Sequence, residues 1–161
     1  MNRVNESKLS YISKEVHLGE LKRSILAEND ILVTIAGATI GKCVIVPKRL
    51  IPANTNQALA IIRLKEDVNV HYVLHLLRSD HMKQYISNCA KGSAQPNLNL
   101  KQISDLKIPL PSLSEQERIV SILDKFEKLV NDISEGLPAE INARRQQYEY
   151  YREKLLSFKM Q

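Results

Sequence analysis

The last third of the chain has a helical apolar periodicity that the first two thirds lack. A capping box predicts that a helix begins at Ser114, because the Ser114 hydroxyl can accept from the amide of Glu117 while the Glu117 side chain accepts from the amide of Ser114. Gly136 favours the end of this helix, and Pro138 suits the first turn of a second one. The apolar face of the first predicted helix is formed by Ile119, Ile122, Leu123, Phe126, Leu129, Val130 and Ile133.

The second predicted helix carries a heptad seam, because seven residues follow one another at alternating spacings of four and three. From residue 137 to residue 158 this helix would be roughly 30 Å long at about 1.5 Å per residue. An arginine and two tyrosines suit a partly hydrated coiled-coil contact better than a protein core. A helical hairpin that closes on its own domain stays open as an alternative. The seam consists of Leu137, Ile141, Arg144, Tyr148, Tyr151, Leu155 and Phe158.

Residues 1–110 have a strand-rich pattern after a polar opening that ends near Ala27 and predicts loops with short helix or strand pieces. Short apolar runs bounded by glycine, proline and asparagine predict strands, and a three- and four-residue apolar spacing predicts one helix. The predicted fold class is therefore α+β, with a mixed-sheet domain over residues 1–110 and two long helices over residues 111–161. The predicted strands are 31–35, 43–46, 58–64 and a closing strand 106–110, and the predicted helix is 70–86.

The two parts of the chain also differ in charge. Residues 1–110 hold 15 Lys and Arg against 9 Asp and Glu, whereas residues 111–161 hold 8 against 9. A basic surplus in the globular part favours a polyanion such as DNA or RNA, although many basic domains bind neither. The chain has no apolar run of about 18 residues and no apolar leader, so we expect a cytoplasmic protein without a membrane segment. Cys43 and Cys89 fit a reducing compartment, where they would pack in the core.

Catalytic signatures are weak in this sequence. Residues 37–42 are similar to a phosphate loop, but three residues separate the two glycines where four are required, and Cys43 stands in place of the metal-binding Ser or Thr. His71 and His75 could share a helix face, but the sequence supplies no third metal ligand. Asp105 and Lys107 would matter in a small metal-dependent nuclease, a hypothesis that we keep open. We expect no catalytic residue, no metal site and no cofactor.

Two polar segments suit nucleic-acid recognition. Residues 54–57 precede a predicted strand, and residues 91–99 join the predicted helix to the closing strand. Asn and Gln can pair with adenine edges, Lys can contact phosphate or guanine, and glycine allows close backbone approach. The alternative is that these amides bond the backbone of their own turns. The candidate DNA-binding residues are Lys42, Asn56, Gln57, Lys91, Gly92, Ser93, Gln95 and Asn97.

Four segments occur in a single order along the chain, namely residues 29–42, 55–58, 92–99 and 108–120. Together they resemble the specificity subunit of type I restriction-modification systems. This resemblance implies a target recognition domain that reads double-stranded DNA and a helical region that acts as a spacer. It also implies that the subunit does no chemistry itself and that methyltransferase and restriction subunits assemble on it.

The resemblance also implies a departure in length. A full specificity subunit has two recognition domains and two helical regions, whereas this chain has one of each and is expected to lack the opening segment of its domain. We therefore expect either a half subunit that forms a homodimer through its helices and reads a palindromic split site, or a carboxy-terminal piece of a subunit. A third hypothesis is a regulatory protein that binds methyltransferase subunits through its helices without reading DNA.

Overall fold

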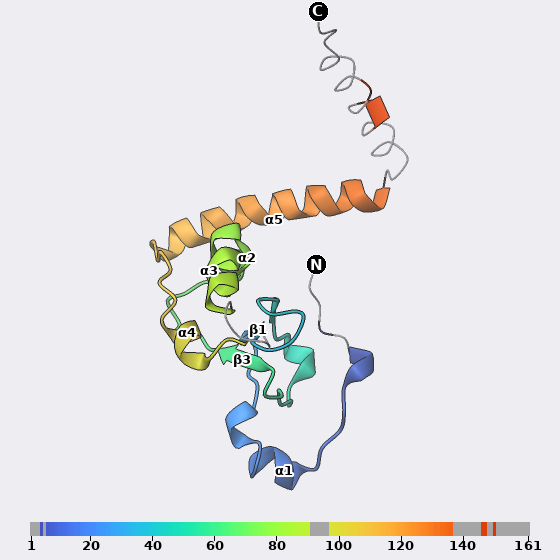
Figure 1. Ribbon diagram of the computed structural model, residues 1–161, viewed down its shortest axis with the longest axis vertical. Coiled ribbons are helices and arrows are strands. Elements are labelled where there is room, and N and C mark those ends of the chain that lie inside the picture. The colour runs from blue at the N-terminus through green and yellow to red at the C-terminus, as the bar shows by residue number, and fades with distance from the viewer. Residues whose placement is uncertain (1–3, 5, 91–96, 137–145, 148–149, 151–161) are drawn as a thin grey trace, which may run out of the picture. The chain divides into compact units, whose positions relative to one another are not determined.

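The computed structural model describes the chain except for residues 1–3, 5, 91–96, 137–145, 148–149 and 151–161 (Figure 1). The chain divides into two compact units, Met1–Val120 and Ser121–Gln161. Most of the described strands and helices lie in the first unit, and the last long helix, Leu113–Gly136, continues into the second. No helix among the described residues is long and apolar enough to cross a membrane.

The first unit is built around a small antiparallel sheet with the strand order β2-β1-β3. Val33 of the central strand pairs with Cys43, and Thr34 pairs with Leu59. The predicted α+β class is confirmed, and the three expected strands agree with the structure to within two residues at each end. The expectation of a mixed sheet is wrong for the described part, in which every strand pair is antiparallel. The strands are β1 (Ile31–Thr34), β2 (Cys43–Ile45) and β3 (Leu59–Ile62).

The two faces of the sheet bury different residues, as the alternation of side chains along a strand requires. On one face Ile31 and Val33 pack with Tyr72 and Leu77 of helix α2 (Val70–Arg78) and with Ile86 of helix α3 (Asp80–Ala90). Figure 1 shows these two helices close to the sheet. The other face buries Leu26, Leu32 and Val46. Cys43 is buried in the first of these clusters, and burial raises the pKa of its thiol.

The single helix predicted over residues 70–86 is wrong, because the structure has two helices separated at Ser79. Ser79 is extended, with φ −63° and ψ 154°, and its hydroxyl accepts a 3.3 Å hydrogen bond from the amide of Met82. Serine competes with the helical backbone in this way and favours helix starts. Asn69 caps α2 by accepting from the amides of His71 at 2.9 Å and Tyr72 at 3.2 Å.

The predicted closing strand over residues 106–110 is also wrong, because these residues form no regular structure. Pro109 has no backbone N–H to donate to a ladder, and its carbonyl accepts a 3.0 Å hydrogen bond from the Tyr72 hydroxyl. Short helices were expected near the amino terminus and are present. The remaining short elements of this unit are η1 (Glu6–Lys8), α1 (Lys14–Leu18), η2 (Lys22–Ser24), η3 (Lys48–Leu50) and α4 (Leu100–Ser104).

Helix α5 (Leu113–Gly136) begins one residue before the predicted cap. The amides of Glu115 and Gln116 each donate a 3.0 Å hydrogen bond to the carbonyl of Ser112, so Ser114 lies inside the first turn. In the second unit Ile122, Leu123 and Phe126 are exposed. The predicted seam lies outside the described residues, and this applies to Leu137, Ile141, Arg144, Tyr148, Tyr151, Leu155 and Phe158.

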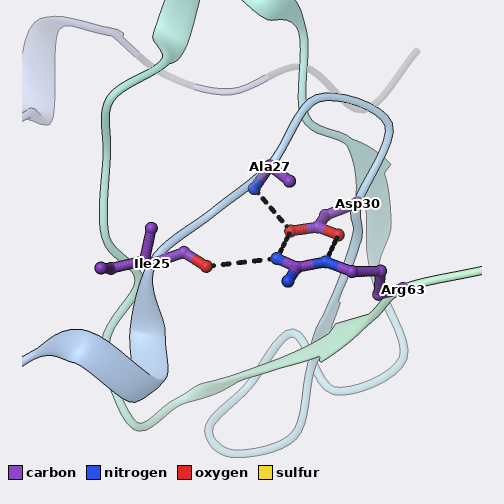
Figure 2. A network of polar contacts seen from close by, with 4 residues as sticks. All are labelled: Ile25, Ala27, Asp30 and Arg63. Carbon is purple, nitrogen blue, oxygen red and sulfur yellow. Dashed lines mark hydrogen bonds and ion pairs between the residues drawn. The ribbon is translucent and has the colours of Figure 1, made fainter.

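An ion pair between buried Asp30 and exposed Arg63 closes the end of the sheet where β1 starts and β3 finishes (Figure 2). Arg63 donates to both carboxylate oxygens of Asp30, at 2.8 and 2.7 Å, and also to the carbonyl of Ile25 at 3.3 Å. The amide of Ala27 donates to Asp30 at 2.7 Å. Burial opposes the charged form, but these hydrogen bonds and the charge of Arg63 outweigh it and hold the pKa of Asp30 below its ordinary value.

Candidate nucleic-acid interface

Three segments that are distant in the sequence meet at the opposite end of the sheet, where β1 finishes. The amide of Thr34 donates to the carbonyl of Lys42 at 2.8 Å, which fixes the turn before β2. The amide of Ile35 donates to the carbonyl of Ala58 at 2.8 Å, and the carbonyl of Ile35 accepts from the amide of Leu98 at 2.8 Å. The backbone after β1 therefore joins the β1–β2 turn, the entry to β3 and the segment that precedes α4.

This arrangement brings four of the predicted DNA-binding residues to one end of the sheet. Lys42 lies at the close of the β1–β2 turn, Asn56 and Gln57 precede β3, and Asn97 forms an isolated antiparallel bridge with Ala36. All four candidates are exposed. The other four candidates lie outside the described residues, namely Lys91, Gly92, Ser93 and Gln95.

The two asparagines of residues 54–57 differ in what they bond. The side-chain oxygen of Asn56 accepts from the amide of Ala58 at 3.0 Å, which is a local turn contact. Asn54 instead joins distant segments, because its amide group donates to the carbonyl of Leu21 at 2.8 Å and to the hydroxyl of Ser24 at 3.0 Å. Its oxygen also contacts Nδ1 of His17. Asn54 therefore anchors the segment that carries Asn56, rather than serving as a surface amide.

The turn between β1 and β2 contains two glycines in the left-handed region, Gly37 with φ 88° and Gly41 with φ 83°. A Cβ at Gly41 would lie 3.3 Å from Cγ2 of Ile86, so this glycine lets the turn pack against α3. A Cβ at Gly37 would meet no atom of the described residues within 4 Å. Gly37, Ala38 and Thr39 form an exposed tip. The sequence indicated no binding role for this tip. Its glycine spacing was the only signal there, and that spacing does not fit a nucleotide phosphate loop.

Lys42 supplies a positive charge at this end of the sheet. Among the described residues it forms no ion pair. The Lys42 ammonium is thus available to an anion from solution. An arrangement of an exposed lysine, exposed amides and small residues suits contacts to a nucleic acid, in which phosphate contacts position the protein and amides read base edges.

The nuclease hypothesis gains nothing from the geometry. Asp105 and Lys107 line a cavity of about 220 Å³ together with His81, Met82, Tyr85 and Leu106. Among the described residues of that lining, Asp105 is the only carboxylate, whereas a two-metal nuclease site needs acidic groups that clamp both ions. A hydrogen bond with Cys89 raises the pKa of Tyr85 above its ordinary value.

Comparison with known proteins identifies the family. Residues 1–143 match the family described as the type I restriction modification DNA specificity domain. The specificity subunit of the Escherichia coli type I restriction enzyme EcoR124I/EcoR124II is 37% identical over 155 residues, which cover 95% of this chain and 38% of that subunit. The EcoBI specificity subunit of E. coli is 38% identical over 139 residues, which cover 80% of this chain and 28% of the relative.

A third relative comes from a different bacterium. The specificity subunit of the type I restriction enzyme MpnII of Mycoplasma pneumoniae is 32% identical over 105 residues, which cover 65% of this chain and 31% of that subunit. The chain therefore spans between 28 and 38% of the length of these three relatives. The match to the family extends over most of the chain and includes the sheet, the candidate interface and the whole of α5. The chain belongs to the type I restriction modification DNA specificity domain family.

Proposed function

We propose that this chain recognises a DNA sequence and directs the methyltransferase and restriction subunits of a type I restriction-modification complex to it, with no chemistry of its own. The observation that carries the proposal is the meeting of three segments at the end of β1, which gathers Lys42, Gln57 and Asn97 on one exposed end of the sheet. The family and the names of the relatives supply the biological setting.

The candidate residues divide by the contact that each can make. Lys42 and Lys91 are suited to phosphate, which positions the protein without reading sequence. Gln57, Gln95 and Asn97 can form bidentate contacts to base edges in the major groove. The side-chain oxygen of Asn56 already accepts one turn bond, so its NH₂ group and the second lone pair of that oxygen remain for DNA. Gly92 and Ser93 would allow close backbone approach.

The helical region, residues 111–161, is proposed to dock partner subunits and to pair with a second copy of the chain. Support comes from the exposure of apolar side chains on α5, since Ile122, Leu123 and Phe126 have 40, 38 and 62% of their surface exposed. Surfaces of this kind are typical of helices that have a partner. A homodimer would present two recognition domains, and such a complex would act in the cytoplasm, where chromosomal DNA is found in bacteria.

The proposal is tested by measuring the affinity of the full chain for a duplex selected from a randomised pool, at several salt concentrations. We expect Lys42→Ala to weaken binding to all sequences and to reduce the salt slope by about one. The control is Lys101→Ala, which removes an exposed lysine of α4. A chain that binds no duplex, alone or with a methyltransferase subunit, would contradict DNA recognition. If it still bound that subunit, a purely regulatory role would replace it.

A further inference from the structure

The exposed tip of the β1–β2 turn has hydrogen-bond donors that the protein itself does not use. Within the part of the chain that the structure describes, the amides of Ala38 and Thr39 donate no hydrogen bond, whereas the amides of Gly41 and Lys42 donate to the carbonyls of Thr34 at 2.9 Å and Thr39 at 3.1 Å. Resting on the DNA recognition proposed above, we propose that this tip binds a phosphate of the DNA backbone. The ligands would be the two amides, the Thr39 hydroxyl and the Lys42 ammonium.

The turn is held in place before any ligand arrives. Thr34 makes two backbone hydrogen bonds to the end of the turn. Its amide donates to the carbonyl of Lys42, and its carbonyl accepts from the amide of Gly41. Gly41 packs against the side chain of Ile86, which is buried in the core. The turn therefore loses its conformational entropy when the protein folds. Binding an anion does not have to order the turn again, which lowers the free-energy cost of binding. Backbone amides in such turns form concave sites that favour phosphate oxygens.

The chemistry around the turn favours an anion and disfavours a cation. Residues 31–65 contain no Asp or Glu, although they contain five Lys and Arg. The tip residues are small, so the backbone can approach a phosphate closely. Among the described residues, no atom lies within 4 Å of the place where a Cβ of Gly37 would stand, so the space beside this glycine is open to a ligand. Nothing in the fold requires this opening for packing, in contrast to Gly41.

A backbone phosphate of DNA is a better match than a free nucleotide. The glycine spacing does not fit a nucleotide phosphate loop, and Cys43 replaces the hydroxyl residue that would bind magnesium. In addition, Asn97 and Gln57 lie at the same end of the sheet, so a phosphate held at the tip would place the adjacent bases near groups that can read them. The tip would thus set the register of the protein on the duplex.

The test changes the charge at Ala38, whose φ is negative and accepts any side chain. Ala38→Lys is expected to tighten binding to every duplex by about fivefold and to raise the salt slope by about 0.9, because one more counterion is released. Ala38→Glu is expected to weaken binding by a similar factor. The matched controls make the same changes in net charge at the Asp30 end of the sheet. Glu28→Gln raises the net charge by one, as Ala38→Lys does, and Lys65→Gln lowers it by one, as Ala38→Glu does.

The outcomes separate this proposal from the one on which it rests. If the parent binds DNA while the Ala38 variants behave as their controls do, the tip is not a phosphate site. If the parent binds no duplex, the proposed function fails and this site fails with it. Circular dichroism checks that Ala38→Glu is folded. If Ala38→Glu is unfolded, the binding of Ala38→Lys still tests the site, because this variant is expected to bind more tightly than the parent. In an NMR titration, millimolar ATP is expected to shift the parent's amide signals at residues 38 and 39 no more than inorganic phosphate does; a clearly larger shift with ATP would overturn the assignment to DNA.

Discussion

The side-chain oxygen of Gln116 accepts a 2.9 Å hydrogen bond from the backbone amide of Asn69, which lies 47 residues earlier in the chain. The same side chain donates to the carbonyl of Pro111 at 2.9 Å and is 1% exposed. Asn69 caps helix α2, and Gln116 lies in the first turn of α5. One amide group therefore joins the starts of two helices within the first unit.

Replacing Gln116 with alanine should leave two backbone groups without a partner in a buried place. We expect Gln116→Ala to lower the free energy of unfolding by about 3 kcal/mol, since each unsatisfied buried group costs roughly 1–3 kcal/mol. The neighbouring Glu117→Ala, at an exposed position, should change stability by less than about 0.5 kcal/mol. Urea denaturation followed by circular dichroism measures both values. Equal stabilities of the two variants would show that the Gln116 bonds contribute nothing.

The ion pair of Asp30 and Arg63 should make stability depend on acid pH. Because the folded state holds the pKa of Asp30 below its ordinary value of about 3.9, the pair stabilises the fold above that pH and loses its contribution as the pH falls through the folded-state pKa. Asp30→Asn should lower stability at pH 7 by about 2 kcal/mol. The variant should also lose less stability than the parent between pH 5 and pH 2, as measured by thermal unfolding. Parallel pH profiles for parent and variant would contradict this account.

The two glycines of the β1–β2 turn should differ in what they tolerate. Both have positive φ, so an alanine at either position costs about 1–2 kcal/mol in backbone strain. At Gly41 the new Cβ would also press on Ile86 at 3.3 Å, and we expect Gly41→Ala to be the more destabilising of the two. Gly37→Asn should be tolerated, because asparagine accepts the left-handed region. A Gly37→Ala variant with the lower melting temperature would refute this reading of the turn.

The sequence predicted the three strands and the class of the fold because these depend on local patterns of apolar residues and turns. It failed at Ser79, where a helical apolar pattern continues across a residue that ends one helix and caps the next. It failed again at residues 106–110, where a largely apolar run that contains Pro109 pairs with no strand among the described residues. Strand pairing depends on tertiary contacts, which a periodicity does not contain. The break at Ser79 comes with a local serine cap that the apolar spacing does not reveal.

The candidate interface shows the same division. The sequence indicated Lys42, Gln57 and Asn97 as DNA-binding groups from their residue types. That they lie at one end of the sheet depends on the backbone hydrogen bonds of Ile35, which a sequence pattern does not show. The anchoring role of Asn54 was hidden as well, since its partners lie 30 or more residues away. The sequence alternative was a local turn contact for both Asn54 and Asn56, and of these two residues only Asn56 makes such a contact.

Two asparagines that are close in sequence should have separable roles. Asn99 caps α4 in a capping box with Gln102, with hydrogen bonds of 2.8 and 2.9 Å, whereas the side chain of Asn97 is exposed beside Ala36. We expect Asn99→Ala to cost about 1 kcal/mol of stability with little change in base preference. Asn97→Ala should instead keep stability and relax the preference at one base pair. Binding to a panel of single-base variants of the selected duplex, together with melting temperatures, measures both effects; the reverse pattern would exchange their roles.

The central claim is that the end of the sheet formed by Ile35, Lys42, Gln57 and Asn97 reads DNA sequence. The most direct test is to select duplexes from a randomised pool with the parent chain and with Gln57→Ala, and to sequence the bound fraction. The account predicts that the parent enriches a defined half-site and that the variant enriches the same half-site with one position relaxed. Enrichment of no motif by the parent, or an identical motif from both proteins and from Asn97→Ala, would contradict it.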